Sequence, residues 1–162
     1  MVSRIVCGGQ SGADRAAVDF ALACGVPYGG WVPRGGWAED FPDAPGLLAR
    51  YLEFRATPSD NPDVRTMWNV RDSTATLVVR RDTSPSSGTD ATVRAVAHFA
   101  RPLHDVDALD AVAVNRLRTF LLECRPPIAL NVAGARESES PGIYEATLRL
   151  LEASADLFSR RT

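Results

Sequence analysis

The chain has 162 residues, of which 45% are hydrophobic and 23% are charged. These fractions are ordinary for a globular protein and exclude a disordered or fibrous chain, and the length predicts a single domain over residues 1–162. The formal net charge of −2 excludes a general nucleic-acid binder, because such proteins carry a clear basic excess. All 18 basic residues are arginine, which is typical of a protein from a GC-rich genome.

The three cysteines, Cys7, Cys24 and Cys124, are widely spaced, and neither histidine stands at zinc-ligand spacing from them. This pattern predicts reduced thiols, with neither a disulfide framework nor a structural zinc site. The sequence opens directly on a strand-like run, and no apolar stretch approaches the ~18 residues of a membrane span. We therefore expect a cytoplasmic protein without a signal peptide or a membrane segment.

Hydrophobic periodicity predicts strands that alternate with helices. Strands are expected at residues 3–7, 28–32, 50–56, 75–80, 102–106 and 128–132, and helices at 13–24, 63–72, 89–100, 108–124 and 141–159. Residues 33–45 and 84–88 are expected to form loops, and Ser140 with Pro141 is expected to begin the last helix. Such an alternation predicts a Rossmann-like, doubly wound α/β fold with a mostly parallel sheet.

Ligands of such sheets bind beyond the carboxyl ends of the strands, where the loops that lead into helices gather. The first of these loops follows the first strand, and its glycines would let the backbone approach an anion at the positive end of the next helix. Its candidate ligand-binding residues are Gly8, Gly9, Gln10, Ser11, Gly12 and Arg15. The loop matches neither the Walker A motif nor G-x-G-x-x-G, which disfavours hydrolysis of nucleoside triphosphates.

Two later loops have the same position relative to a strand and a helix. The second spans residues 86–89, and the third spans residues 131–142. Each loop also has a plainer interpretation, as a packing turn or a solvated connection. No Ser/His/Asp or Cys/His set can be assembled, so we assign no catalytic residue and no metal ligand.

Other conspicuous residues are interpreted as structural. Trp31, Trp37 and Trp68 are expected in the core or at an interface rather than against a ligand. The adjacent charges of residues 71–72 and 39–40 are expected to form surface ion pairs.

Together the loops resemble those of the molybdenum cofactor carrier family, which belongs to the SLOG superfamily of Rossmann-like proteins. The resemblance runs in order over nearly the whole chain and rests on residues 8–15, 38–40, 65–73, 87–89 and 131–144. It implies a homodimer or homotetramer that stores or transfers the molybdenum cofactor, a phosphate-bearing pyranopterin that holds molybdenum on a dithiolene. The residues that match the family's cofactor-binding motifs are those named in the first loop, Ser87, Gly88 and Thr89 in the second, and Asn131, Gly134, Arg136, Glu137 and Ser138 in the third. Three departures are Ser87 for the usual glycine, Ala135 for the usual proline, and Thr74-Ala75 for the usual Asp-Gly.

Two alternatives remain open. An SLOG-type nucleoside 5′-monophosphate phosphoribohydrolase would use an arginine and a glutamate, for which Arg136 and Glu137 are candidates, but residues 90–93 lack the glutamate that follows the glycine motif of those enzymes. A nucleotide-sensing or ADP-ribose-sensing module would share the same anion site. In all three cases, valine in place of Gly9 is expected to weaken phosphate binding while leaving the fold largely intact.

Overall fold

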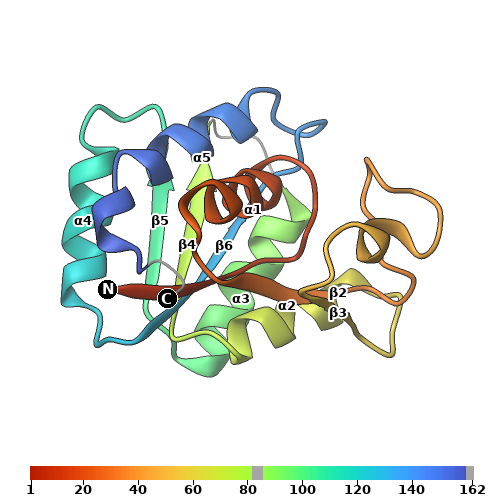
Figure 1. The fold of residues 1–162 in the computed structure, drawn as a ribbon. Coiled ribbons are helices and arrows are strands. Elements are labelled where there is room, and N and C mark those ends of the chain that lie inside the picture. The colour runs from red at the N-terminus through yellow and green to blue at the C-terminus, as the bar shows by residue number, and fades with distance from the viewer. Residues whose placement is uncertain (82–85, 160–162) are drawn as a thin grey trace.

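The structure is a computed structural model, which describes residues 1–81 and 86–159. Within these residues, six parallel strands form one sheet in the order β3-β2-β1-β6-β4-β5 (Figure 1). The strands are β1 (Val2–Val6), β2 (Tyr28–Val32), β3 (Phe54–Ala56), β4 (Ala75–Arg80), β5 (Leu103–Asp107) and β6 (Ile128–Gly134). The helices are α1 (Ala13–Cys24), α2 (Pro62–Arg71), α3 (Ser87–Phe99), α4 (Ala113–Glu123) and α5 (Ile143–Glu152). The predicted Rossmann-like α/β fold is confirmed.

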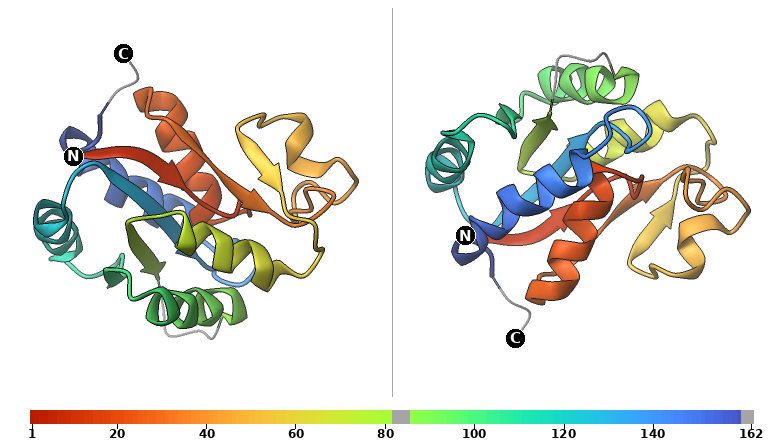
Figure 2. Two further views of the ribbon diagram at one scale, coloured as in Figure 1. Left: turned by 90° about the horizontal axis from the view of Figure 1, so that it is seen from below. Right: turned by 90° about the horizontal axis from the view of Figure 1, so that it is seen from above.

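The helices cover both faces of the sheet. Figure 2 shows α2 and α3 on one face and α1 and α5 on the other, with α4 beside the edge strand β5. The larger core cluster lies on the α1 and α5 side and includes Ile5, Phe20, Leu117, Leu130 and Leu151. Because central parallel strands are buried on both faces, the first five residues of β4 are all buried, and the bounds of β4 match the prediction.

The strand order explains which loops meet. β6 comes last in the chain but lies between β1 and β4, so the loops that follow β1, β4 and β6 emerge side by side at the carboxyl edge. The start of β1 also meets the end of the described chain, since the Ser159 backbone N–H donates to the Val2 carbonyl at 2.7 Å. If β6 and α5 came before β1 in the chain, the sheet would start at β6 in its centre. The chain would then add β1, β2 and β3 on one side and β4 and β5 on the other, each in sequence order.

The predicted helix at 108–124 starts later than its apolar pattern suggests. The Asp107 carboxylate accepts from the Leu109 N–H at 2.9 Å, and the Asp110 carboxylate accepts from the Val112 N–H at 3.0 Å. These side-chain turns compete with helix formation, so α4 begins only at Ala113.

The last helix is also shorter than predicted. It runs from Ile143 to Glu152, and a short 3-10 helix at Ala155–Leu157 follows it. The third strand, expected at residues 50–56, is shorter than predicted and covers only Phe54–Ala56. Of the loop predicted at residues 84–88, residues 84–85 lie outside the described residues. No disulfide joins the three cysteines in the structure. None of the helices that the structure describes is long and apolar enough to cross a bilayer.

Candidate functional site

A cavity of about 120 Å³ lies at the carboxyl edge, where the three predicted loops meet. It brings together five of the predicted residues, Gln10, Ser87, Gly88, Gly134 and Arg136. Its other walls include residues to which the sequence assigned no ligand role, among them Asp14, Trp37, Asp63, Arg65 and Glu139. A larger groove of about 520 Å³ between α4 and α5 contains none of the predicted residues. The smaller cavity is therefore the candidate site.

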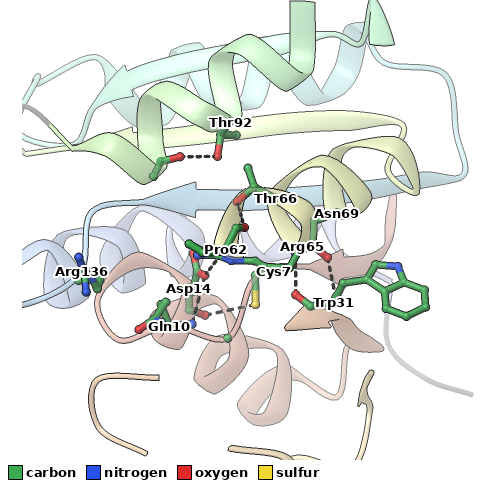
Figure 3. A network of polar contacts seen from close by, with 12 residues as sticks. Cys7, Gln10, Asp14, Trp31, Pro62, Arg65, Thr66, Asn69, Thr92 and Arg136 are labelled. Atoms are coloured by element: carbon green, nitrogen blue, oxygen red, sulfur yellow. Dashed lines mark hydrogen bonds and ion pairs between the residues drawn. The ribbon is translucent and has the colours of Figure 1, made fainter. Parts of the chain in front are cut away.

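An internal carboxylate occupies the first loop. Asp14 is buried, accepts a hydrogen bond from the Gln10 backbone N–H at 3.2 Å and lies 3.7 Å from the Arg65 guanidinium (Figure 3). Burial raises the pKa of the Asp14 carboxyl, although Arg65 and the backbone amides of Gln10 and Gly8 oppose the shift. The amides that were expected to meet a ligand anion are thus directed at a carboxylate of the protein itself.

The glycines of this loop leave room for the protein's own groups. A Cβ on Gly8 would overlap the Arg65 guanidinium. Gly12 has φ +69°, and its Cβ would overlap the Ala135 carbonyl and lie 2.8 Å from the Glu137 backbone nitrogen. The loop after β6 is therefore packed directly on the first loop.

Other polar residues of the first and third loops hold the segment 38–41. The Glu39 carboxylate accepts from the Ser11 hydroxyl and, at 2.5 Å, from the Ser138 hydroxyl. Burial would raise the pKa of Glu39, but these hydrogen bonds outweigh it, so the pKa lies below its usual value. Arg15 pairs with Asp40 at 2.7 Å, and its guanidinium lies 5.0 Å from the centres of two aromatic rings, those of Phe41 and Tyr51.

Glu137 caps the last helix. Its two carboxylate oxygens accept from the backbone N–H groups of Gly142 at 2.5 Å and Tyr144 at 3.0 Å. These bonds satisfy amides at the start of α5, where a negative charge is favourable. Glu137 thus performs the capping role that the sequence predicted for Ser140.

The first turn of α3 forms the open wall of the cavity. Ser87 and Gly88 are exposed there, and the amides of a first helical turn have no acceptor within the helix. The N-cap residue Ser86 accepts from the Thr89 N–H at 3.4 Å and donates to the Glu139 carboxylate at 3.1 Å. A carboxylate thus already stands beside the positive end of α3.

Arg136 holds that carboxylate in place. The Arg136 guanidinium contacts Glu139 at 2.7 Å and 3.1 Å, and its backbone N–H donates to the same carboxylate at 3.2 Å. Burial would raise the pKa of Glu139, but the hydrogen bonds from Arg136 and Ser86 outweigh it and hold the pKa below its usual value. Charge-assisted contacts of this kind are the ones that a phosphate group would also make.

The remaining predicted residues lie outside the main cavity. Gly8 and Asn131 border a small adjoining cavity of about 10 Å³, and Asn131 donates to the Thr76 hydroxyl at 3.4 Å. Gly9 has φ +70° and packs against Leu47, and Thr89 is a buried residue of the first turn of α3. Within residues 1–81 and 86–159, no three His, Cys, Asp or Glu side chains are grouped to hold a metal ion.

Arg65 is a cavity residue that sequence reasoning could have found. Residues 65–73 carried part of the family resemblance, and the helical spacing of Arg65, Thr66 and Asn69 places them on one face of α2, toward β1 and β2 (Figure 3). Glu139 gave the same signal, because it lies within residues 131–144 of that resemblance, whereas Trp37 lies outside its stretches.

Comparison with known proteins decides the family. A model of the circularly permutated YpsA SLOG family matches residues 5–155. The chain belongs to this family. Its permutation agrees with the position of β6 between β1 and β4 and with the contact between Val2 and Ser159.

A solved structure of similar fold adds a more specific relation. It is the crystal structure of a "putative molybdenum carrier protein" from Syntrophus aciditrophicus SB, which is 34% identical, with a TM-score of 0.80 over 94% of each chain. No protein with a curated description matches the sequence significantly. The suspected SLOG relationship is confirmed, and the permuted family is the more exact assignment.

Proposed function

We propose that this SLOG protein binds the molybdenum cofactor through its phosphate and stores it or transfers it to another protein. The observation that carries the proposal is the open first turn of α3 at the cavity, flanked by Arg65 and Arg136. A helix N-terminus with neighbouring guanidinium groups provides the amide donors and the positive charge that a phosphate requires. The proposal includes a cytoplasmic homodimer or homotetramer, as the family resemblance implies.

The size of the cavity suits one part of this cargo. A volume of about 120 Å³ corresponds to roughly four waters at about 30 Å³ each, which is room for a phosphate group but not for a pterin. We assign Ser87, Gly88, Arg65 and Arg136 to the phosphate. The remaining candidates of the first and third loops support this wall rather than meet the anion.

Both positive charges of the cavity are already neutralised, because Arg65 and Arg136 are each paired with a carboxylate. Asp63 adds a further acidic side chain to the wall. A phosphate would therefore have to take over part of the hydrogen bonding that Glu139 now receives. This exchange would make binding reversible, which suits a carrier that must release its cargo.

The phosphoribohydrolase alternative needs a carboxylate that can reach the ribose. Both oxygens of its candidate, Glu137, accept hydrogen bonds from the start of α5, which argues against that role. A nucleotide-sensing or ADP-ribose-sensing module would use the same phosphate wall. Only the identity of the bound ligand distinguishes such a module from a carrier of the molybdenum cofactor.

The test is a binding experiment with three phosphate-bearing ligands. The protein is incubated with molybdenum cofactor released from a molybdoenzyme, with AMP and with ADP-ribose, and is then desalted. Bound molybdenum is measured by elemental mass spectrometry, bound pterin by fluorescence after oxidation, and ribose 5-phosphate release by a coupled assay. We expect retention of molybdenum and pterin in equal amounts, and no release of ribose 5-phosphate.

A matched pair of variants locates the site. Arg136→Met should lose most of the retained cofactor, whereas Arg149→Met, in an exposed pair with Glu145, should retain it. Retention of a nucleotide alone would refute the carrier function, and equal retention by both variants would place the site elsewhere.

A further inference from the structure

Trp37 is an exposed aromatic side chain on the wall of the candidate cavity. It is 42% exposed, although its neighbours Gly36 and Ala38 are buried. Among the large hydrophobic side chains that are exposed in the described part of the chain, it is the one aromatic. Leaving an indole in water forfeits the free energy of burying it, so its exposure at this place calls for an explanation.

The segment around Trp37 is held firmly by the first loop. The buried Gln10 side chain donates to the Trp37 carbonyl at 3.4 Å and accepts from the Glu39 N–H at 3.2 Å. The Gly36 carbonyl also accepts from the Leu47 N–H at 3.0 Å. The backbone that carries the indole is thus fixed in advance, which lowers the entropic cost of binding against it.

The indole and the phosphate wall belong to the same cavity. The Arg136 guanidinium lies 6.0 Å from the centre of the Trp37 ring and also lines the wall that we assign to the phosphate. Since a phosphate in this cavity would leave too little room for a ring, the rest of a ligand would lie at the mouth, where an exposed indole is available for stacking.

We propose that Trp37 is the platform on which the planar heterocycle of a phosphate-bearing ligand stacks. The ligand class is a phosphate ester joined by a short linker to a planar ring, and the ring is recognised by its flat face. This inference rests on the proposed phosphate site, because the position of the phosphate fixes where the ring can lie. Trp37 then determines specificity between phosphate esters with and without a ring.

The test compares two probes that share a phosphate monoester. One is 6-hydroxymethylpterin phosphate, which carries a planar ring, and the other is glycerol 3-phosphate, which does not. Affinities are measured by calorimetric titration for the wild type, Trp37→Ala, Trp37→Phe and the matched control Trp68→Phe. Trp68 packs edge-to-face on Trp31 and does not line this cavity.

We expect Trp37→Ala to weaken binding of the pterin probe about tenfold or more, the effect of removing an aromatic partner from a stacked base. Its affinity for glycerol 3-phosphate should match the wild type. Trp37→Phe should keep most of the affinity for the pterin probe but lose the quenching of tryptophan fluorescence that the probe causes, whereas Trp68→Phe should keep both.

The outcomes separate the two proposals. If the wild type binds neither probe, the phosphate site itself is wrong and this inference falls with it. If the wild type binds both probes and Trp37→Ala leaves their affinity ratio unchanged, the phosphate site stands and the stacking platform is refuted. A change in self-association of Trp37→Ala without a change in that ratio would assign Trp37 to a subunit interface and would also refute it.

Discussion

Replacing Arg65 by methionine should affect both the stability of the fold and the binding of a ligand, and a second substitution at Asp14 separates the two effects. Asp14 and Arg65 retain only 5% and 15% of their side-chain exposure, so the substitution leaves an uncompensated carboxylate in the interior. Breaking a buried pair by removing one partner costs about 3 to 5 kcal/mol. The 3.7 Å separation and the amide bonds that Asp14 keeps place this case at the low end of that range. We expect Arg65→Met to lower the free energy of unfolding by about 3 kcal/mol at neutral pH, as measured by urea denaturation.

The double variant Asp14→Asn/Arg65→Met removes the orphaned charge and should recover most of that stability. Ligand affinity should not recover, since a charge-assisted hydrogen bond to the phosphate, worth about 1.5 to 3 kcal/mol, remains lost. Titration with 6-hydroxymethylpterin phosphate should therefore show binding weakened about tenfold to a hundredfold in both variants. Wild-type affinity in the stable double variant would show that Arg65 acts only by holding Asp14, and would refute its assignment to the phosphate.

Four further outcomes follow from the contacts of the site. Glu139→Gln should tighten phosphate binding about fivefold in the same titration, because it weakens the hold on Arg136; unchanged affinity would contradict the proposed exchange. Glu137→Gln should lower the free energy of unfolding by about 1 kcal/mol, as for a lost helix cap, without altering affinity; lost affinity would revive its ligand role. The pKa of Glu139 in the folded protein lies below its usual value of 4.5. Its stabilising contribution is therefore present above pH 4.5 and is lost as the pH falls through the folded pKa. On acidification, the urea midpoint should thus drop less in Glu139→Gln than in the wild type. Gly12→Ala should lower the melting temperature more than Gly25→Ala, which has a similar φ of +67° but no atom within 4 Å of the new Cβ; equal losses would show that only φ matters.

The fold could be predicted because the strands that form its centre are buried on both faces and short in sequence. Periodicity located β2 and β4 to the residue. It failed at residues 108–112, where the apolar spacing continues but two aspartates form side-chain turns, and Leu109 is left 62% exposed. Apolar spacing indicates which side chains would lie on the buried face of a helix. Where the helix starts depends also on whether nearby side chains, here two aspartates, accept hydrogen bonds from the backbone amides.

The edge of the sheet that carries the site could be predicted from topology alone, since every β-to-α loop of a parallel sheet opens there. The partners of the charged residues could not. Arg65 reaches Asp14 from a different helix, and Glu139 bonds to Ser86 across the gap between two loops. Such pairs depend on distances that a single sequence does not contain, so neither the contact of Arg65 with Asp14 nor that of Glu139 with Ser86 could be predicted.

The first loop shows how one sequence feature supports two opposite interpretations. A glycine after a strand permits close approach, but the sequence does not say what approaches: here Arg65 lies against Gly8, and the loop after β6 packs on Gly12. The expectation that Gly9→Val would spare the fold is wrong, because Gly9 has φ +70° and its Cβ would lie 2.9 Å from Leu47. Valine there would strain the backbone as well as the packing, so loss of binding in that variant would say nothing about a phosphate. The glycines instead let the first loop hold Asp14, Arg65 and the segment of Trp37 in fixed positions, and the proposed phosphate site lies at the open first turn of α3.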